Sequence, residues 1–116
     1  MTNEEAIKLV VHEGLTGESG VVVMVRMGEY PGRERMAALL EALEVVREEL
    51  RGQAFLDREL AHVLFRLAFH VQRDVERWLS QGRVWREEFV DEEMVRMFEL
   101  IESIFGDEAV QVADED

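Results

Sequence analysis

The sequence predicts a mainly α-helical fold: a compact bundle of three long helices and a short N-terminal helix, with a minor β element at 21–27. Apolar residues recur at spacings of three and four over most of the chain after residue 33. Glycines separate these stretches where helices commonly end. With 116 residues, 47% of them apolar and 34% charged, the chain has the size and composition of a single globular domain, residues 1–116.

The short N-terminal helix is expected at about 3–13. Thr2 and Glu5 have the spacing of a capping box, in which each side chain binds the other residue's backbone N–H at a helix start. Gly14 suits the left-handed conformation that closes many helices, so the helix is expected to end there. Further glycines at 17 and 20 then indicate a connecting loop.

Residues 21–27 are apolar and mostly β-branched, and they lie between Gly20 and Gly28. This pattern favours a buried strand, although periodicity alone does not separate it from a short buried helix. A single strand leaves its backbone groups unpaired. We therefore expect it to pair with residues 109–112 or with its own copy in a second subunit.

Three long helices are expected after the turn at 30–32, which contains the only proline of the chain. In each of them an apolar stripe at helical spacing is accompanied by charged residues on the other side. Short connections make consecutive helices antiparallel neighbours. The helices are expected at about 33–51, 55–80 and 91–105, with Gly52 and Gly82 in the connections.

Aromatic residues gather before the last helix. Trp85 and Phe89 lie in the connection and, with Trp78, form the main aromatic cluster. Such a cluster more often closes the end of a core than lines a pocket. At the other end of the last helix, residues 113–116 are expected to form a frayed acidic tail.

Charge and composition exclude several classes of function. The formal charge of −13 repels nucleic-acid phosphates, which proteins bind mainly through Lys and Arg, so nucleic acid is not an expected partner. No apolar run approaches the roughly 18 residues of a membrane span, and the N-terminus lacks the pattern of a signal peptide. The absence of cysteine excludes disulfides and thiolate sites. A cytoplasmic location fits these features best.

The charges are also unevenly distributed. Residues 1–56 carry −4, residues 57–86 carry +2 and residues 87–116 carry −11. The basic middle segment contains the longest expected helix, 55–80. Packing the acidic last helix near it would pair opposite charges.

The helix at 55–80 has two distinct faces. One face carries large apolar residues expected in the core, and the opposite face carries histidines and arginines bordered by Phe65 and Phe69. A solvent-facing helix side seldom needs two phenylalanines beside such charges, which raises the alternative that another helix or a second subunit covers this stripe. The candidate partner-binding residues are His62, Arg66, Phe69, His70, Arg73 and Arg77.

Three interpretations of this stripe stay open. The simplest is a solvated face whose ion pairs contribute only about 0–1 kcal/mol each. A subunit interface comes next, and a ligand or metal site last. Glu59 and His62 have the spacing found in di-metal helical bundles, but the chain has no second such pair, and His70 lies about 12 Å further along the axis. No metal or cofactor is therefore expected.

Catalytic motifs are also missing. The glycines at 14, 17 and 20 follow an expected helix and precede an expected strand, whereas phosphate loops follow a strand and open into a helix. None of the five serine and threonine residues lies in a recognisable nucleophile motif. We therefore expect no catalytic residue, and the chain is more easily explained as a binding protein than as an enzyme.

The sequence favours a small acidic, non-enzymatic interaction or regulatory domain that forms a homodimer and presents an acidic surface to another protein. One alternative is a small metal- or ligand-binding enzyme that uses Glu59, His62 and His70. The other is a nucleic-acid mimic or immunity-type inhibitor, in which the acidic helix from residue 91 imitates a row of phosphates.

Overall fold

The computed structural model describes residues 1–15 and 19–106, and these residues fold into a helical bundle, as predicted. Two helices contain a π-helical segment, whose backbone hydrogen bonds reach one residue further than in an α-helix. The elements are α1 (Asn3–Gly14), α2 (Val21–Arg26), α3 (Arg33–Leu50), α4 (Arg58–Phe65), the π-helical η1 (Arg66–His70), α5 (Val71–Ser80), the π-helical η2 (Phe89–Glu93) and α6 (Met94–Phe105).

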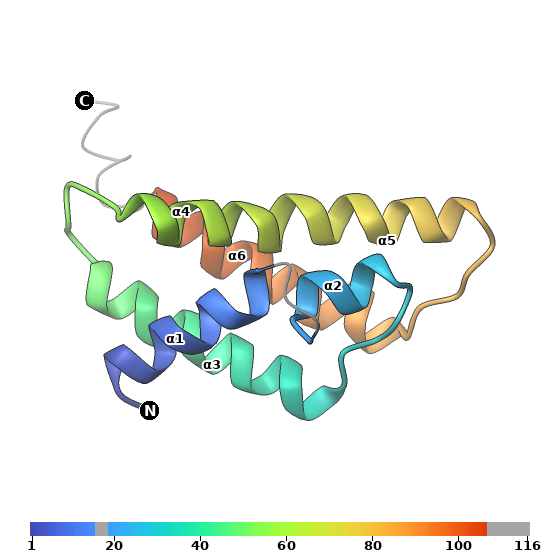
Figure 1. Ribbon diagram of the computed structural model, residues 1–116, viewed down its shortest axis with the longest axis horizontal. Helices are drawn as coiled ribbons and strands as arrows, with labels where there is room; N and C mark the ends of the chain where they lie inside the picture. The colour runs from blue at the N-terminus through green and yellow to red at the C-terminus, as the bar shows by residue number, and fades with distance from the viewer. Residues whose placement is uncertain (16–18, 107–116) are drawn as a thin grey trace.

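α4, η1 and α5 follow one another without a break and form one long helix, Arg58–Ser80, along one edge of the molecule (Figure 1). α1 packs against α3 and α4, α2 packs against α5 and η1, and α6 packs against α3 and η1. The other helices therefore lie on one side of the long helix (Figure 1). Its opposite side faces away from the bundle.

α1 begins at the predicted capping box. The Thr2 hydroxyl accepts from the Glu5 backbone N–H at 3.1 Å, and the Thr2 N–H donates to the Glu5 carboxylate at 2.9 Å. The prediction that Gly14 ends the helix in a left-handed conformation is wrong, because Gly14 is still helical and is buried. A Cβ at this position would collide with Val63 of α4. The glycine thus permits close packing of α1 against the long helix.

The strand predicted at 21–27 is wrong, because Val21–Arg26 form the short helix α2. Val21, Val22 and Val25 are fully buried on one side of that helix. The Val21 N–H donates to the buried Glu13 carboxylate at 3.3 Å, which satisfies a backbone donor that the helix itself leaves unpaired. Because backbone groups pair within a helix, this segment does not require the strand partner that was predicted for it. The predicted partner segment 109–112 lies outside the described residues.

The three long helices lie close to their predicted bounds. The long helix begins at Arg58 rather than 55, because Asp57 caps it by accepting from the Leu60 N–H at 3.0 Å. Gly52 and Gly82 end the preceding helices in the left-handed conformation. The last helix begins earlier than the predicted residue 91 and includes η2. The predicted tail at 113–116 lies outside the described residues.

The core lies between the long helix and the other helices. Leu60, Val63, Leu64, Leu67 and Val71 supply its buried row on the long helix. One end is closed by Phe89, which is fully buried and contacts Trp85, as the predicted aromatic cluster implies, and Tyr30, which that cluster did not include. The third predicted member, Trp78, packs against Gly28 and donates to the Arg26 carbonyl instead.

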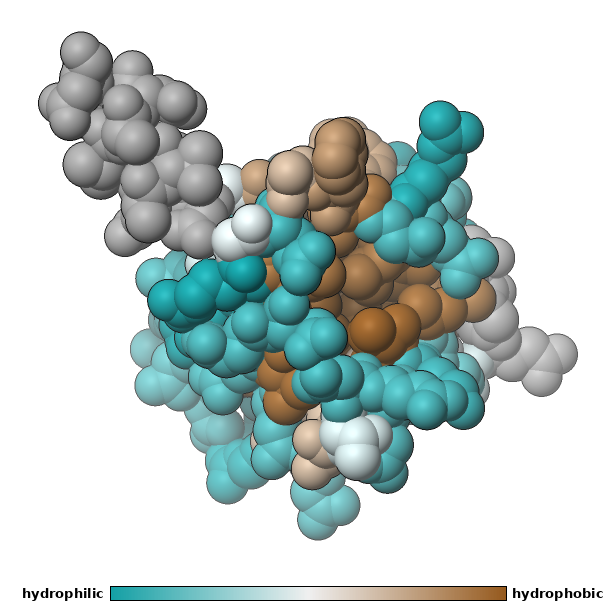
Figure 2. Space-filling model, turned by 90° about the vertical axis from the view of Figure 1, so that its left-hand side faces the viewer, coloured by the Kyte–Doolittle hydropathy of each residue, from teal (hydrophilic) through white to brown (hydrophobic). Residues whose placement is uncertain are grey.

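Apolar side chains also reach the surface. Figure 2 shows them at the end of the molecule where α3 leads into α4 and above the long helix. Phe55, in that connection, is 89% exposed. Among the described helices, none combines the length and the apolar content that a membrane span requires.

Candidate interaction surface on the long helix

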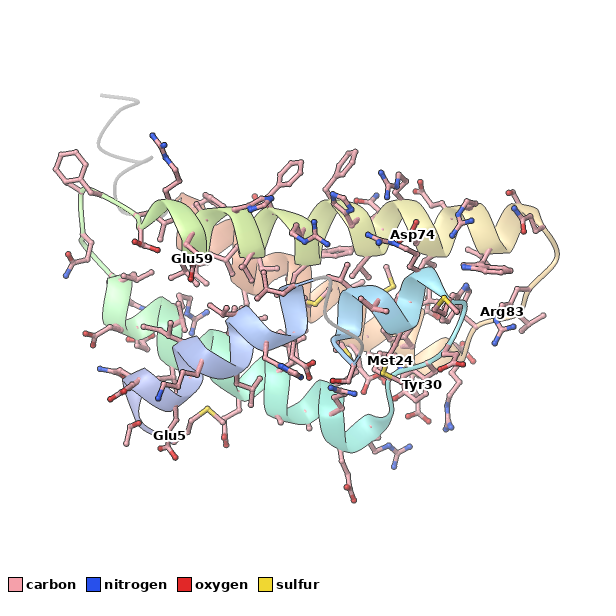
Figure 3. All side chains as sticks on the ribbon, in the orientation of Figure 1. Glu5, Met24, Tyr30, Glu59, Asp74 and Arg83 are labelled. Atoms are coloured by element: carbon pink, nitrogen blue, oxygen red, sulfur yellow. The ribbon has the colours of Figure 1, made fainter. Side chains whose placement is uncertain are left out.

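The side of the long helix that faces away from α1, α2 and α6 is called here the outer face. Figure 3 shows side chains standing away from the bundle along this helix. Phe65 and Phe69 lie on the outer face and are each 50% exposed. Removing apolar surface from water is favourable by about 25 cal/mol per Å². A partner that covers both rings would therefore be bound more tightly. The outer face is therefore the candidate interaction surface.

The two phenylalanines are arranged as one aromatic group. Their ring centroids are 5.2 Å apart and the rings are nearly parallel, at 14°. The His70 ring meets both of them edge-on. The Arg73 guanidinium carbon lies 5.8 Å from the Phe69 ring centroid, within the range of a cation–π contact. An apolar centre with a cation at its border is typical of interface hot spots.

Two of the predicted partner-binding residues donate to backbone carbonyls of the short helices. Arg66 donates through Nε to the Gly14 carbonyl at 2.8 Å, and Arg77 donates to the Arg26 carbonyl at 3.2 Å. These carbonyls lie at or next to the C-terminal ends of α1 and α2, where the helix dipole favours a cation. Arg66 and Arg77 thus fasten the two short helices to the long one.

The structure therefore divides the predicted stripe. His62, Phe69 and Arg73 are exposed, together with Phe65, whereas His70 and Arg66 are partly buried along its border. The internal partners of Arg66 and Arg77 could not be found from the sequence, because the acceptors are backbone carbonyls more than 50 positions away. The predicted charge pairing with the last helix is not seen in the described residues, where the long-helix arginines form their ion pairs with Asp74.

Asp74 is a functional candidate that the sequence interpretation missed. It lies on α5 beside α2 (Figure 3), and its side chain is only 4% exposed. Three guanidinium groups surround its carboxylate, with N–O distances of 3.8 Å to Arg26, 3.6 Å to Arg73 and 3.7 Å to Arg77. The signal for it was an acid three residues after the buried Val71, in a row otherwise apolar. Asp74 holds arginines at the edge of the outer face.

The local charges also affect His70. Burial lowers the pKa of His70 below its usual value, and the neighbouring guanidinium groups of Arg73 and Arg66 lower it further. The imidazole is therefore neutral at neutral pH. Its Nδ1 lies 3.3 Å from the Arg73 guanidinium, a position in which a neutral ring nitrogen accepts a hydrogen bond.

Many of the acidic side chains of the protein lie away from the outer face. A shallow groove of about 380 Å³ between the start of α1 and α3 is lined by Asn3, Val45 and four glutamates, Glu41, Glu44, Glu48 and Glu49. For Glu59 and His62, the structure adds no third ligand: residues 1–15 and 19–106 contain no group of three histidines or acids placed to hold a metal ion.

Comparison of the chain with family models, with curated proteins and with solved structures finds no match in any of the three. A helical bundle does not specify an activity, so the outer face is the feature of this protein that bears on function.

Proposed function

We propose that this chain is a non-enzymatic protein-interaction domain that acts as a homodimer and uses the outer face of the long helix for binding. The observation that carries the proposal is the stacked pair Phe65 and Phe69, half exposed on a helix that already has a complete core on its other side. Neither ring is needed to fill the core. Their exposure is explained by a partner that covers them.

The charge distribution supports the same face. Within Arg58–Ser80 there are four arginines and three acids, a charge of +1 in a chain that carries −13. An acidic protein therefore meets the least repulsion here, and a second copy of this chain is such a protein. The acidic groove on α3 stays free to present its glutamates to another protein. The lack of cysteine supports a reducing, cytoplasmic location.

The test compares the wild-type protein with the double variant Phe65→Ser/Phe69→Ser. Self-association is measured by light scattering over a concentration series, and capture of other proteins by affinity purification. We expect the double variant to lose self-association, because the apolar centre of the surface is removed, whereas capture of a protein by the acidic groove on α3 should stay unchanged. Phe105→Ser is the matched control, since Phe105 has a similar exposure of 52% but lies at the end of α6.

Circular dichroism should show the same helix content in all three proteins. Unchanged self-association in the folded double variant would reject the proposed function.

A further inference from the structure

We infer that the occupant of the outer face is a second copy of this chain, whose long helix packs antiparallel against the first about a two-fold axis between Phe65 and Phe69. The inference rests on the proposed function and specifies its partner. It is carried by a row of eight residues, called here the outer seam. These residues are Phe55, Arg58, His62, Phe65, Phe69, Gln72, Glu76 and Leu79.

The outer seam has the spacing of a coiled-coil contact. Its members follow one another at alternating intervals of three and four residues, the pattern by which two helices meet along a single line. All eight are exposed in the structure. Seven lie on the long helix, and Phe55 lies just before its start. The helix thus has one complete heptad row in the core and a second one facing outward.

The chemistry of the seam is palindromic, and this indicates a second copy rather than an unrelated helix. A two-fold axis between Phe65 and Phe69 places each of these rings against the other in the second copy. Moving outward, His62 then faces Gln72, which can hydrogen-bond to it. Arg58 next faces Glu76, an oppositely charged pair, and the exposed Phe55, which precedes the helix, lies at the end of the row that Leu79 of the second copy approaches. A two-fold interface requires such self-complementarity, because each contact occurs twice.

The flanks of the seam agree with the same register. Glu59 of one copy falls beside Arg73 of the other, at the flanking positions that form ion pairs across antiparallel helices. Arg66 falls nearest the axis, where two like charges would meet. Its hydrogen bond to the Gly14 carbonyl holds the guanidinium against α1 instead. Ala68, on the opposite flank, is small enough for close helix approach.

Cross-linking tests the register directly, because the chain contains no cysteine of its own. The double variant His62→Cys/Gln72→Cys places both thiols on the seam. Within one chain they are about 15 Å apart at 1.5 Å per residue, too far for a disulfide, but across the inferred interface they face each other. We expect mild oxidation to convert most of this variant into a reducible covalent dimer. His62→Cys alone should give little, because its two copies are also about 15 Å apart.

Charge exchange tests the same register without oxidation. Arg58→Glu and Glu76→Arg each set two like-charged pairs across the interface, and each should weaken dimerisation by about fivefold or more in sedimentation experiments. The double variant Arg58→Glu/Glu76→Arg restores opposite charges and should recover the wild-type dissociation constant. The two positions are about 27 Å apart within one chain, so recovery has to come from contact between copies.

The outcomes separate this inference from the proposed function. Covalent dimers from the double cysteine variant, together with recovery by the charge exchange, support the antiparallel pairing. A wild-type protein that is monomeric at about 200 μM, a concentration at which even weak dimers are detected, overturns both the pairing and the homodimer of the proposed function. A dimer that needs both phenylalanines but shows neither cross-link nor recovery overturns the register alone. A dimer that does not need them overturns both.

Discussion

Two buried carboxylates, one near each end of α2, have nearly the same exposure but different surroundings. Glu13 is 5% exposed, accepts from Arg35 Nε at 2.8 Å and accepts from the Val21 N–H. Asp74 is 4% exposed and has three arginines at 3.6–3.8 Å. Its Oδ2 nevertheless has no hydrogen-bond partner among the described residues.

The difference shows how similar burial can serve different purposes. The contacts of Glu13 join the end of α1, the start of α2 and the helix α3, and both of its oxygens have donors. Asp74 attracts guanidinium groups that stay between 38% and 52% exposed. Glu13 therefore fixes the fold, whereas Asp74 positions charges at a surface.

The largest effect is expected for Glu13→Ala. Its removal leaves Arg35 without its anion and the Val21 N–H without an acceptor in a buried setting, so the free energy of unfolding should fall by about 3 kcal/mol. Urea unfolding followed by circular dichroism measures this. A loss under about 1 kcal/mol, the value for an ordinary exposed pair, would show that the two carboxylates do not differ as described.

A smaller effect is expected for Asp74→Asn. The arginines around Asp74 are half solvated and stand beyond hydrogen-bond distance, so removing the negative charge should cost about 1 kcal/mol. The same urea experiment measures it, with the exposed Glu102→Gln as the control that should change little. If Asp74→Asn lowers the free energy of unfolding as much as Glu13→Ala does, the two carboxylates do not have the different roles described here. Arg73 would also lose its anchor, so weaker self-association of the folded variant is expected.

The smallest effect concerns pH. Because the pKa of His70 is lowered in the folded protein, the unfolded chain takes up a proton at this residue first as the pH falls below 6.5. Stability should therefore decrease on acidification, from pH 6.5 down to the lowered pKa of His70 in the folded state. The groups that face His70 are Arg73, Arg66, Arg26 and Asp74. Thermal unfolding of His70→Asn should show a flatter pH dependence in this window, and an equally steep one would refute the assignment.

Much of the fold could be predicted from the sequence, because its signals are local. The capping box at Thr2, the glycines at 52 and 82 and the apolar rows of the long helices needed no information from distant residues. The error at 21–27 arose because a short β-branched apolar run has no decisive period. The helical conformation of this run is favoured by contacts outside it: the Glu13 carboxylate binds the start of the helix, and the long helix buries its valines.

The candidate site was predicted in part. The exposed Phe69 was found because an apolar ring breaks the expectation that a solvent-facing side is polar, and Arg73 was found because it lies in the same stripe. Arg66 and Arg77 were assigned to a partner, while the structure engages them with backbone carbonyls, which no sequence pattern marks. Asp74 was missed because the row at core spacing is otherwise apolar, and an acid is seldom buried unless arginines surround it, as they do here.

The hydrogen bond from Arg66 to Gly14 also has a consequence for kinetics. It joins residues 52 positions apart, so it can form only after a long stretch of chain has closed into a loop. A contact that forms after the folding transition state slows unfolding without accelerating folding, and we expect this one to be of that kind. The arginine that fastens α1 would thus lengthen the lifetime of the native state, and its removal would shorten that lifetime while leaving the refolding rate nearly unchanged.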